Sequence, residues 1–157
     1  NYSGLSYSMA RLGIGMFGVS SNHLVKKQLK PVISWKSSVS QIKTIVKGES
    51  IGSGRSFKAE KDMTIAIIPV GYADGFRRSL SNGKGGIYIG ENYCPTVARV
   101  CMDMIMVDIS EIKVKIGQEV EIIGIHQSID DLAQKMDTIA YEVMTGISKR
   151  VARVYLE

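Results

Sequence analysis

The order of apolar and polar positions along the chain predicts a fold built mainly from β-strands. Residues 32–46 alternate loosely between the two kinds of side chain, which is typical of a half-buried strand. Residues 64–70 form an apolar run rich in β-branched side chains, too short for a helix, and predict a central strand. Similar stretches predict strands over residues 11–19, 97–109, 119–125 and 150–156.

Local signals add one hairpin and two short helices. Residues 90–92, Gly-Glu-Asn, form a tight turn between two short strands. Ser128, with Asp131 three residues later, resembles a capping box and starts a helix over residues 129–136. A second short helix is expected over residues 138–145. The expected fold class is therefore mainly β with two short helices.

The composition excludes several classes of protein for this chain. The chain has 157 residues, of which 45% are apolar, enough for a core. It has no apolar run of about 18 residues and no secretory signal pattern, so we expect no membrane span and a cytoplasmic protein. Two cysteines are too few for a disulfide framework, and two distant histidines give no metal-ligand spacing. We expect no metal site.

The charge is unevenly distributed. Residues 1–61 contain ten Lys or Arg against two acids, a net +8, whereas residues 62–157 contain ten against thirteen, a net −3. The lysines of the first part are scattered between apolar residues, and few aromatic side chains lie among them to stack on bases. We therefore expect no nucleic-acid partner.

Polar groups interrupt the apolar runs at several places. A buried carboxylate or guanidinium without a partner is costly, so such residues usually lie where a strand end meets a ligand. The segments are Arg11-Leu12-Gly13-Ile14, Gly71-Tyr72-Ala73-Asp74-Gly75, Arg99-Val100-Cys101-Met102-Asp103 and Tyr141-Glu142-Val143. Each has a structural explanation if taken alone: Tyr72 as a turn aromatic, Arg99 with Asp103 as an in-sheet ion pair, Met102 as a core residue.

In this order and spacing, the segments resemble the pyridoxal-phosphate-dependent alanine racemases over nearly the whole chain. The resemblance implies that residues 1–30 end an amino-terminal α/β barrel, with its last strand, and that residues 31–157 form the carboxy-terminal, barrel-like β domain. Such enzymes are homodimers, and each site combines one subunit's barrel with the other subunit's β domain. A chain that starts at Asn1 is expected to be a fragment, inactive by itself, because the Schiff-base lysine lies outside it.

The resemblance also implies roles for individual residues. Arg11 would donate to the pyridine nitrogen of pyridoxal 5′-phosphate, and the amides at Gly13 and Ile14 and the hydroxyl of Tyr141 would meet its phosphate. The Met102 amide would bind the carboxylate of the amino-acid substrate. Residues of the substrate entrance would be Tyr72, Arg78, Arg99 and Asp103.

One residue departs from the family pattern. Racemisation needs a proton removed on one face of the substrate and delivered on the other. The family uses the cofactor lysine and a tyrosine, and Ser53 occupies the tyrosine's place in Gly52-Ser53-Gly54-Arg55. A serine hydroxyl is shorter in reach, and its pKa lies far above the ~10 of tyrosine.

The sequence thus predicts part of an alanine racemase that supplies D-alanine for peptidoglycan, weakened at Ser53. Two alternatives stay open. One is a non-catalytic dimerisation or ligand-binding module derived from the same fold, and the other is a serine/alanine racemase of different parent architecture.

Overall fold

The computed structural model describes residues 8–20 and 22–156, which divide into two units at Val32 and Ile33. In the first unit, the described residues include a 3-10 helix, η1 (Ile14–Phe17), and a single helical turn, α1 (His23–Lys26). The predicted strand over residues 11–19 is wrong, because most of this segment is exposed and no strand pairs with it in the described part. A strand without a partner leaves its backbone groups outside any ladder.

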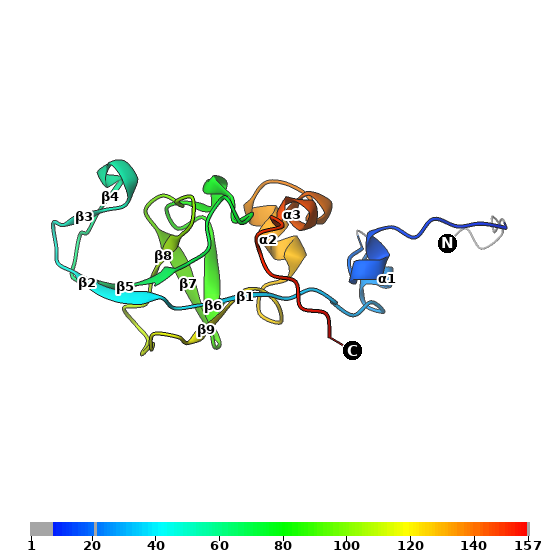
Figure 1. The fold of residues 1–157 in the computed structure, drawn as a ribbon, viewed down its shortest axis with the longest axis horizontal. Helices are drawn as coiled ribbons and strands as arrows, with labels where there is room; N and C mark the ends of the chain where they lie inside the picture. Colours follow the sequence, from blue (N-terminus) through cyan, green and yellow to red (C-terminus); the bar gives the residue numbers. More distant parts are fainter. Residues whose placement is uncertain (1–7, 21, 157) are drawn as a thin grey trace. The chain divides into compact units, whose positions relative to one another are not determined.

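The second unit is built on an antiparallel sheet that curls into a half-barrel (Figure 1). Along the sheet the strands are β1 (Trp35–Ser38), β9 (Glu119–Ile123), β6 (Gly86–Ile89), β7 (Asn92–Val97), β8 (Ile105–Asp108), β5 (Met63–Ile68) and β2 (Gln41–Ile45). The expected single strand over residues 32–46 is therefore two strands, which lie at opposite ends of the sheet and pair with different neighbours. This architecture confirms the predicted mainly β, barrel-like fold class.

The middle of the sheet confirms the hairpin and corrects one strand. β6 and β7 pair with Ile89 opposite Asn92, so Gly90 and Glu91 form the turn. The predicted strand over residues 97–109 is interrupted, because the chain leaves the sheet after Val97 and returns at β8. Ala98 has a φ of 59°, which an extended strand cannot contain. The resulting loop, residues 98–104, carries much of the candidate site.

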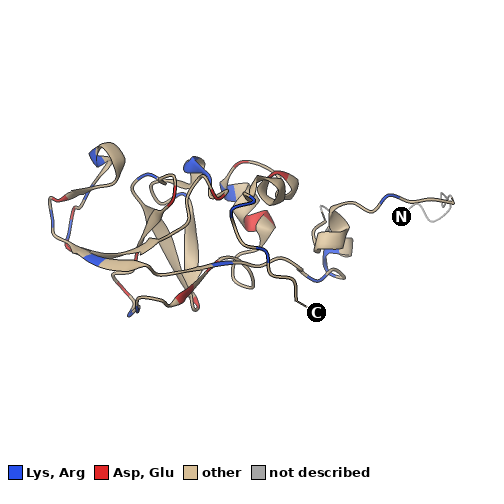
Figure 2. Cartoon of the chain, in the orientation of Figure 1, with Lys and Arg blue, Asp and Glu red and all other residues tan. Residues whose placement is uncertain are grey.

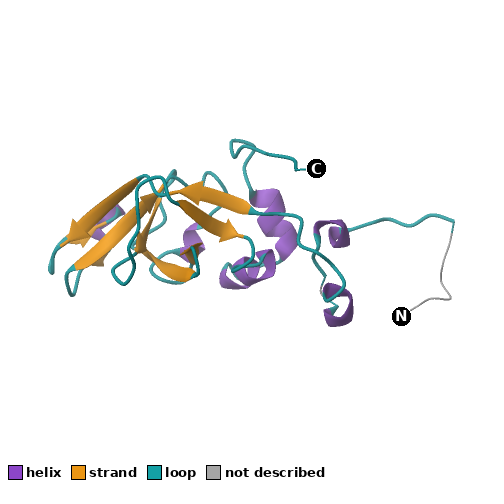
Figure 3. Cartoon of the chain, turned by 90° about the horizontal axis from the view of Figure 1, so that it is seen from below, coloured by secondary structure: helices purple, strands orange, loops and turns teal. Residues whose placement is uncertain are grey.

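Two helices follow the sheet and contact each other (Figure 3). Helix α2 (Ile129–Lys135) begins with the predicted capping box between Ser128 and Asp131, and α3 (Ala140–Gly146) is the second predicted helix. The predicted strand over residues 150–156 is wrong. The Arg153 guanidinium donates to backbone carbonyls of residues 147, 148 and 151, so the chain folds onto itself rather than joining the sheet.

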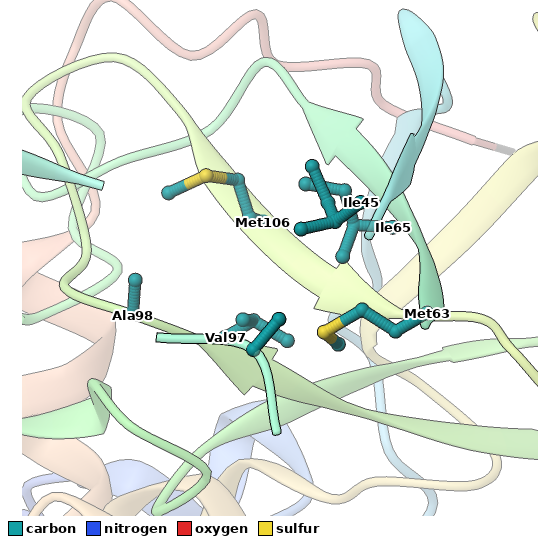
Figure 4. Packing of buried hydrophobic residues seen from close by; sticks show 7 residues of the cluster. Ile45, Met63, Ile65, Val97, Ala98 and Met106 are labelled. Carbon is teal, nitrogen blue, oxygen red and sulfur yellow. The ribbon is translucent and has the colours of Figure 1, made fainter. Parts of the chain in front are cut away.

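A hydrophobic cluster supports the sheet end that carries the site (Figure 4). Its buried members are Ile45, Ala59, Met63, Ile65, Val97, Ala98 and Met106. Phe57, from the small hairpin of β3 (Ser50–Ile51) and β4 (Phe57–Lys58), packs against this cluster, as does Cys101 from the 98–104 loop. Apolar burial therefore holds the hairpin and the loop to the same part of the sheet.

Charged residues are spread along the second unit (Figure 2). Lys and Arg alternate with uncharged segments along β1, β2 and the β3–β4 hairpin. Within the described residues, no helix is both long and apolar enough to cross a bilayer.

Candidate active site

The turn that follows β5 is locked to the 98–104 loop through backbone atoms. The Tyr72 N–H donates to the Cys101 carbonyl at 3.0 Å, and the Ala73 N–H donates to the Met102 carbonyl at 3.0 Å. A Cβ atom on Gly71 would lie 2.3 Å from the Met102 carbonyl oxygen. Only glycine permits this approach, so the sequence motif Gly-Tyr-Ala-Asp-Gly sets the position of the loop.

Ser53 reaches the same loop from the β3–β4 hairpin, whose tip is the 3-10 turn η2 (Ser53–Arg55). A Cβ on Gly52 would lie 2.6 Å from the Ala98 Cβ, so the hairpin tip packs closely on the loop. The Ser53 Oγ lies 3.8 Å from the Cys101 Sγ. Ser53, Tyr72 and Met102, predicted from separate segments, thus meet around Cys101, while their roles stay predictions.

The backbone at Met102 offers a free donor. A trans peptide is planar, so the Met102 N–H points opposite to the Cys101 carbonyl, which faces Tyr72. The Met102 N–H has no acceptor among the described residues. Met102 is 53% exposed, so the interpretation of Met102 as a core residue is wrong. An oriented amide without a partner can bind an anion such as a carboxylate.

An ion network, in which the sequence assigned a role only to Asp103, joins the turn to the loop. Asp74 is buried and accepts a hydrogen bond from the Gly71 N–H at 2.8 Å. Arg150 bridges two carboxylates: its Nε lies 3.0 Å from Asp74 Oδ1 and its Nη2 lies 2.7 Å from Asp103 Oδ1. Among the described ion pairs, Asp103 therefore pairs with Arg150, and the pairing of Asp103 with Arg99 is wrong. Arg150 gave no local sequence signal, whereas Asp74 is an acid at the end of an apolar run.

Arg78 and Arg99 line an open hollow of about 500 Å³ beside the loop. The other lining residues are Ser79, Ser81 and Asn82. Among the described residues, neither arginine has an acidic partner within ion-pair distance. Two guanidinium groups without a carboxylate between them favour an anionic ligand. This arrangement suits an entrance for an amino acid, the role that the sequence predicted for both arginines.

Helix α3 lies against the same turn. A Cβ on Gly75 would lie 2.7 Å from the Gly146 carbonyl oxygen, and Arg77 forms an ion pair with Glu142. Hydrogen bonds from the Thr138 hydroxyl and from Arg77 lower the pKa of the Glu142 carboxyl. Tyr141, which directly precedes Glu142 in the chain, is 53% exposed.

The remaining predicted residues, Arg11, Gly13 and Ile14, lie in the first unit. Arg11 is exposed, and Gly13 precedes η1. Their contact with a cofactor stays a prediction. In the described part of the chain, no group of three His, Cys, Asp or Glu side chains could hold a metal ion.

Comparisons with known proteins agree with one another. Residues 32–155 match the family described as "Alanine racemase, C-terminal domain". The alanine racemase of Clostridium tetani is 46% identical over 93% of this chain and 40% of its own length, and alanine racemase 1 of Clostridium acetobutylicum is 42% identical over 96% and 41%. This chain thus spans about two fifths of the curated relatives it matches.

Solved structures give the same result. The alanine racemase of Bartonella henselae with covalently bound pyridoxal phosphate superimposes with a TM-score of 0.86 at 35% identity, over 92% of this chain and 40% of that one. The Bacillus anthracis enzyme with bound L-Ala-P gives a TM-score of 0.84 at 31% identity, over 92% and 39%. The chain therefore belongs to the alanine racemase family, as its carboxy-terminal domain.

Proposed function

We propose that the longer protein containing this chain is a pyridoxal-phosphate-dependent alanine racemase that interconverts L- and D-alanine in the cytoplasm of a bacterium. Its product would supply peptidoglycan synthesis. In this proposal, residues 1–30 end the α/β barrel and residues 31–157 form the β domain. Family membership supports the reaction class, and the geometry around Met102 supports the presence of a substrate site.

The observation that carries the proposal is the orientation of the Met102 amide. The Tyr72 N–H holds the Cys101 carbonyl at 3.0 Å, and the Met102 N–H on the opposite side of the peptide has no acceptor among the described residues. An unpaired backbone donor is rare unless a ligand or solvent meets it. A carboxylate is a strong acceptor for such a group, and every amino-acid substrate has one.

The groups that the sequence assigns to the cofactor fit its chemistry. The Arg11 side chain is exposed, and the Ile14 N–H at the start of η1 has no backbone acceptor among the described residues. The Tyr141 side chain is half exposed. A guanidinium, oriented amides and a phenol are suitable partners for a pyridine nitrogen and a phosphate. When bound, pyridoxal phosphate stabilises negative charge at the substrate Cα.

Ser53 would stand where a second acid–base group is needed. Its Oγ lies 3.8 Å from the Sγ of Cys101. Cys101 directly precedes Met102, whose amide is the proposed carboxylate-binding group. The hydroxyl is a poor base, and loss of a well-placed base costs about 10²–10⁴ in rate. We therefore propose a slow racemase, in which water held near Ser53 carries the proton.

A homodimer would complete the site. The predicted site residues of the β domain are all exposed in the single chain: Ser53, Tyr72, Arg78, Arg99, Met102, Asp103 and Tyr141. Exposed aromatic and methionine side chains next to arginines are typical of surfaces that a partner covers. The partner's barrel would supply the Schiff-base lysine.

The test is an assay of the full-length protein with pyridoxal phosphate. We expect a visible absorbance band from the bound cofactor and slow formation of D-alanine from L-alanine. Ser53 also favours one alternative, a non-catalytic module that kept the fold. That module would form no D-alanine above the rate of free pyridoxal phosphate, even with the cofactor bound, and this result would overturn the proposed reaction.

A further inference from the structure

We infer that Arg150 is a positioning residue for the substrate carboxylate, because it holds the Met102 amide in its binding orientation. This inference rests on the proposed function. It concerns a residue that does not touch the substrate and acts through Asp103.

Arg150 connects two segments of the chain through ion pairs with two carboxylates. Its Nε contacts Asp74 at 3.0 Å and its Nη2 contacts Asp103 at 2.7 Å. Asp74 is fixed independently of Arg150, because Oδ2 accepts from the Gly71 N–H at 2.8 Å and the Asp74 carbonyl accepts from the Ser148 N–H at 3.0 Å. Because the guanidinium is planar and rigid, its contact with the fixed Asp74 also restricts the position of Asp103.

Asp103 directly follows Met102, so an anchor at Asp103 stabilises the loop whose hydrogen bonds orient the amide. The Cys101 and Met102 carbonyls are held by the 71–75 turn, and the Cys101 N–H donates to the Met104 carbonyl at 3.0 Å. Residues 102–104 are otherwise exposed. The side chain of Asp103 is their charged anchor. Without Arg150, the hydrogen bonds from Tyr72 and Ala73 that fix the Met102 N–H would break more easily.

Charge gives a second, independent reason. An unpaired Asp103 carboxylate one residue from a carboxylate-binding amide would repel the ligand. The Asp103 side chain is 50% exposed, so solvent screens part of this repulsion, and Arg150 offsets the rest. Arg150 therefore favours carboxylate binding through both orientation and charge.

The experiment uses the full-length protein with the substitution Arg150→Gln. We expect the KM for alanine to rise about 5- to 50-fold while kcat changes less than about twofold, because a carboxylate contact stabilises the ground state and the transition state alike. The dissociation constant for acetate, measured by calorimetry, should rise by a similar factor. Arg150→Lys keeps the charge but reaches one carboxylate, so it should give a smaller rise in both values.

Arg153→Gln is the matched control. Within the described part of the chain, Arg153 donates only to carbonyls of residues 147, 148 and 151, so its loss should leave KM and acetate binding unchanged. A merely structural role for Arg150 would lower the melting temperature and the active fraction without changing KM or acetate binding, and that result would overturn the inference. If Arg150→Gln does not fold, Arg150→Lys decides the question by the same two measurements.

Failure of the inference differs from failure of the proposed function. An unsubstituted protein that neither racemises alanine nor binds acetate contradicts the function itself. An active protein whose KM and acetate affinity are the same after Arg150→Gln contradicts only the role of Arg150.

Discussion

The Oγ of Ser53 and the Sγ of Cys101 lie 3.8 Å apart, although 48 positions separate them in the chain. This contact places the hairpin tip over the loop that carries Met102. It also makes Cys101 a chemical reporter of the candidate site.

Thiol labelling should distinguish the two cysteines. Cys101 is half-buried beside Ser53, whereas Cys94 is 1% exposed and burial raises its pKa to about 11. Because the thiolate is the reactive form, iodoacetamide at about pH 8 should modify Cys101 at least about tenfold faster than Cys94. Mass spectrometry of timed digests measures this ratio. Preferential labelling of Cys94 would contradict the described burial.

Gly52 should tolerate alanine much less well than Gly48. Both have a left-handed φ, +81° and +91°, but a Cβ on Gly52 would lie 2.6 Å from the Ala98 Cβ and a Cβ on Gly48 would meet no atom within 4 Å. Both variants incur backbone strain, and only Gly52→Ala adds a clash. We expect Gly52→Ala to lower the free energy of unfolding by about 1–3 kcal/mol more than Gly48→Ala.

Chemical denaturation of the full-length protein measures this difference. Equal losses for the two variants would show that the hairpin tip does not pack on Ala98.

Glu121 should contribute to stability at neutral pH and lose this contribution in acid. Burial raises the pKa of its carboxyl, but hydrogen bonds from His126 and Gln127 outweigh burial, and the net pKa lies below its usual value. The unfolded chain takes up a proton near pH 4.3, at a higher pH than the folded protein. The contribution is therefore complete above that value and disappears as pH falls through the folded pKa.

Urea unfolding at a series of pH values between about 3 and 6 tests this dependence. The variant Glu121→Gln should show a shallower loss of stability in acid than the unsubstituted protein. Glu119→Gln is the control, because Glu119 is 66% exposed in a surface pair with Lys36 and should change the profile little. A profile for Glu121→Gln that matches the unsubstituted protein would contradict the role of these hydrogen bonds.

Local signals in the sequence predicted local structure correctly. The capping box of Ser128 and Asp131 and the turn at Gly90 and Glu91 depend on residues a few positions apart, and both are present. The break at Val39–Ser40 could not be predicted, because apolar periodicity continues through it. Two different neighbours, β9 and β5, decide where one strand ends and the next begins.

The residues of the candidate site show the same difference between local signals and contacts with distant segments. Ser53, Tyr72 and Met102 could be selected from motifs, and the structure brings them together. Arg150 could not, because its partner Asp103 lies 47 positions away and its own segment resembled a plain strand. Contacts between distant residues of opposite charge leave no periodic pattern for a single sequence to display.

We propose that position 53 is the place of a second acid–base group opposite the cofactor lysine. The direct measurement is the rate of alanine racemisation by the full-length protein, Ser53→Tyr and Ser53→Phe, each loaded with pyridoxal phosphate. We predict that Ser53→Tyr raises kcat by about 10²–10⁴, and that Ser53→Phe, which fills the same space without the hydroxyl, does not. A rate for Ser53→Tyr equal to that of the unsubstituted protein, or an equal rise in Ser53→Phe, would contradict this role of position 53.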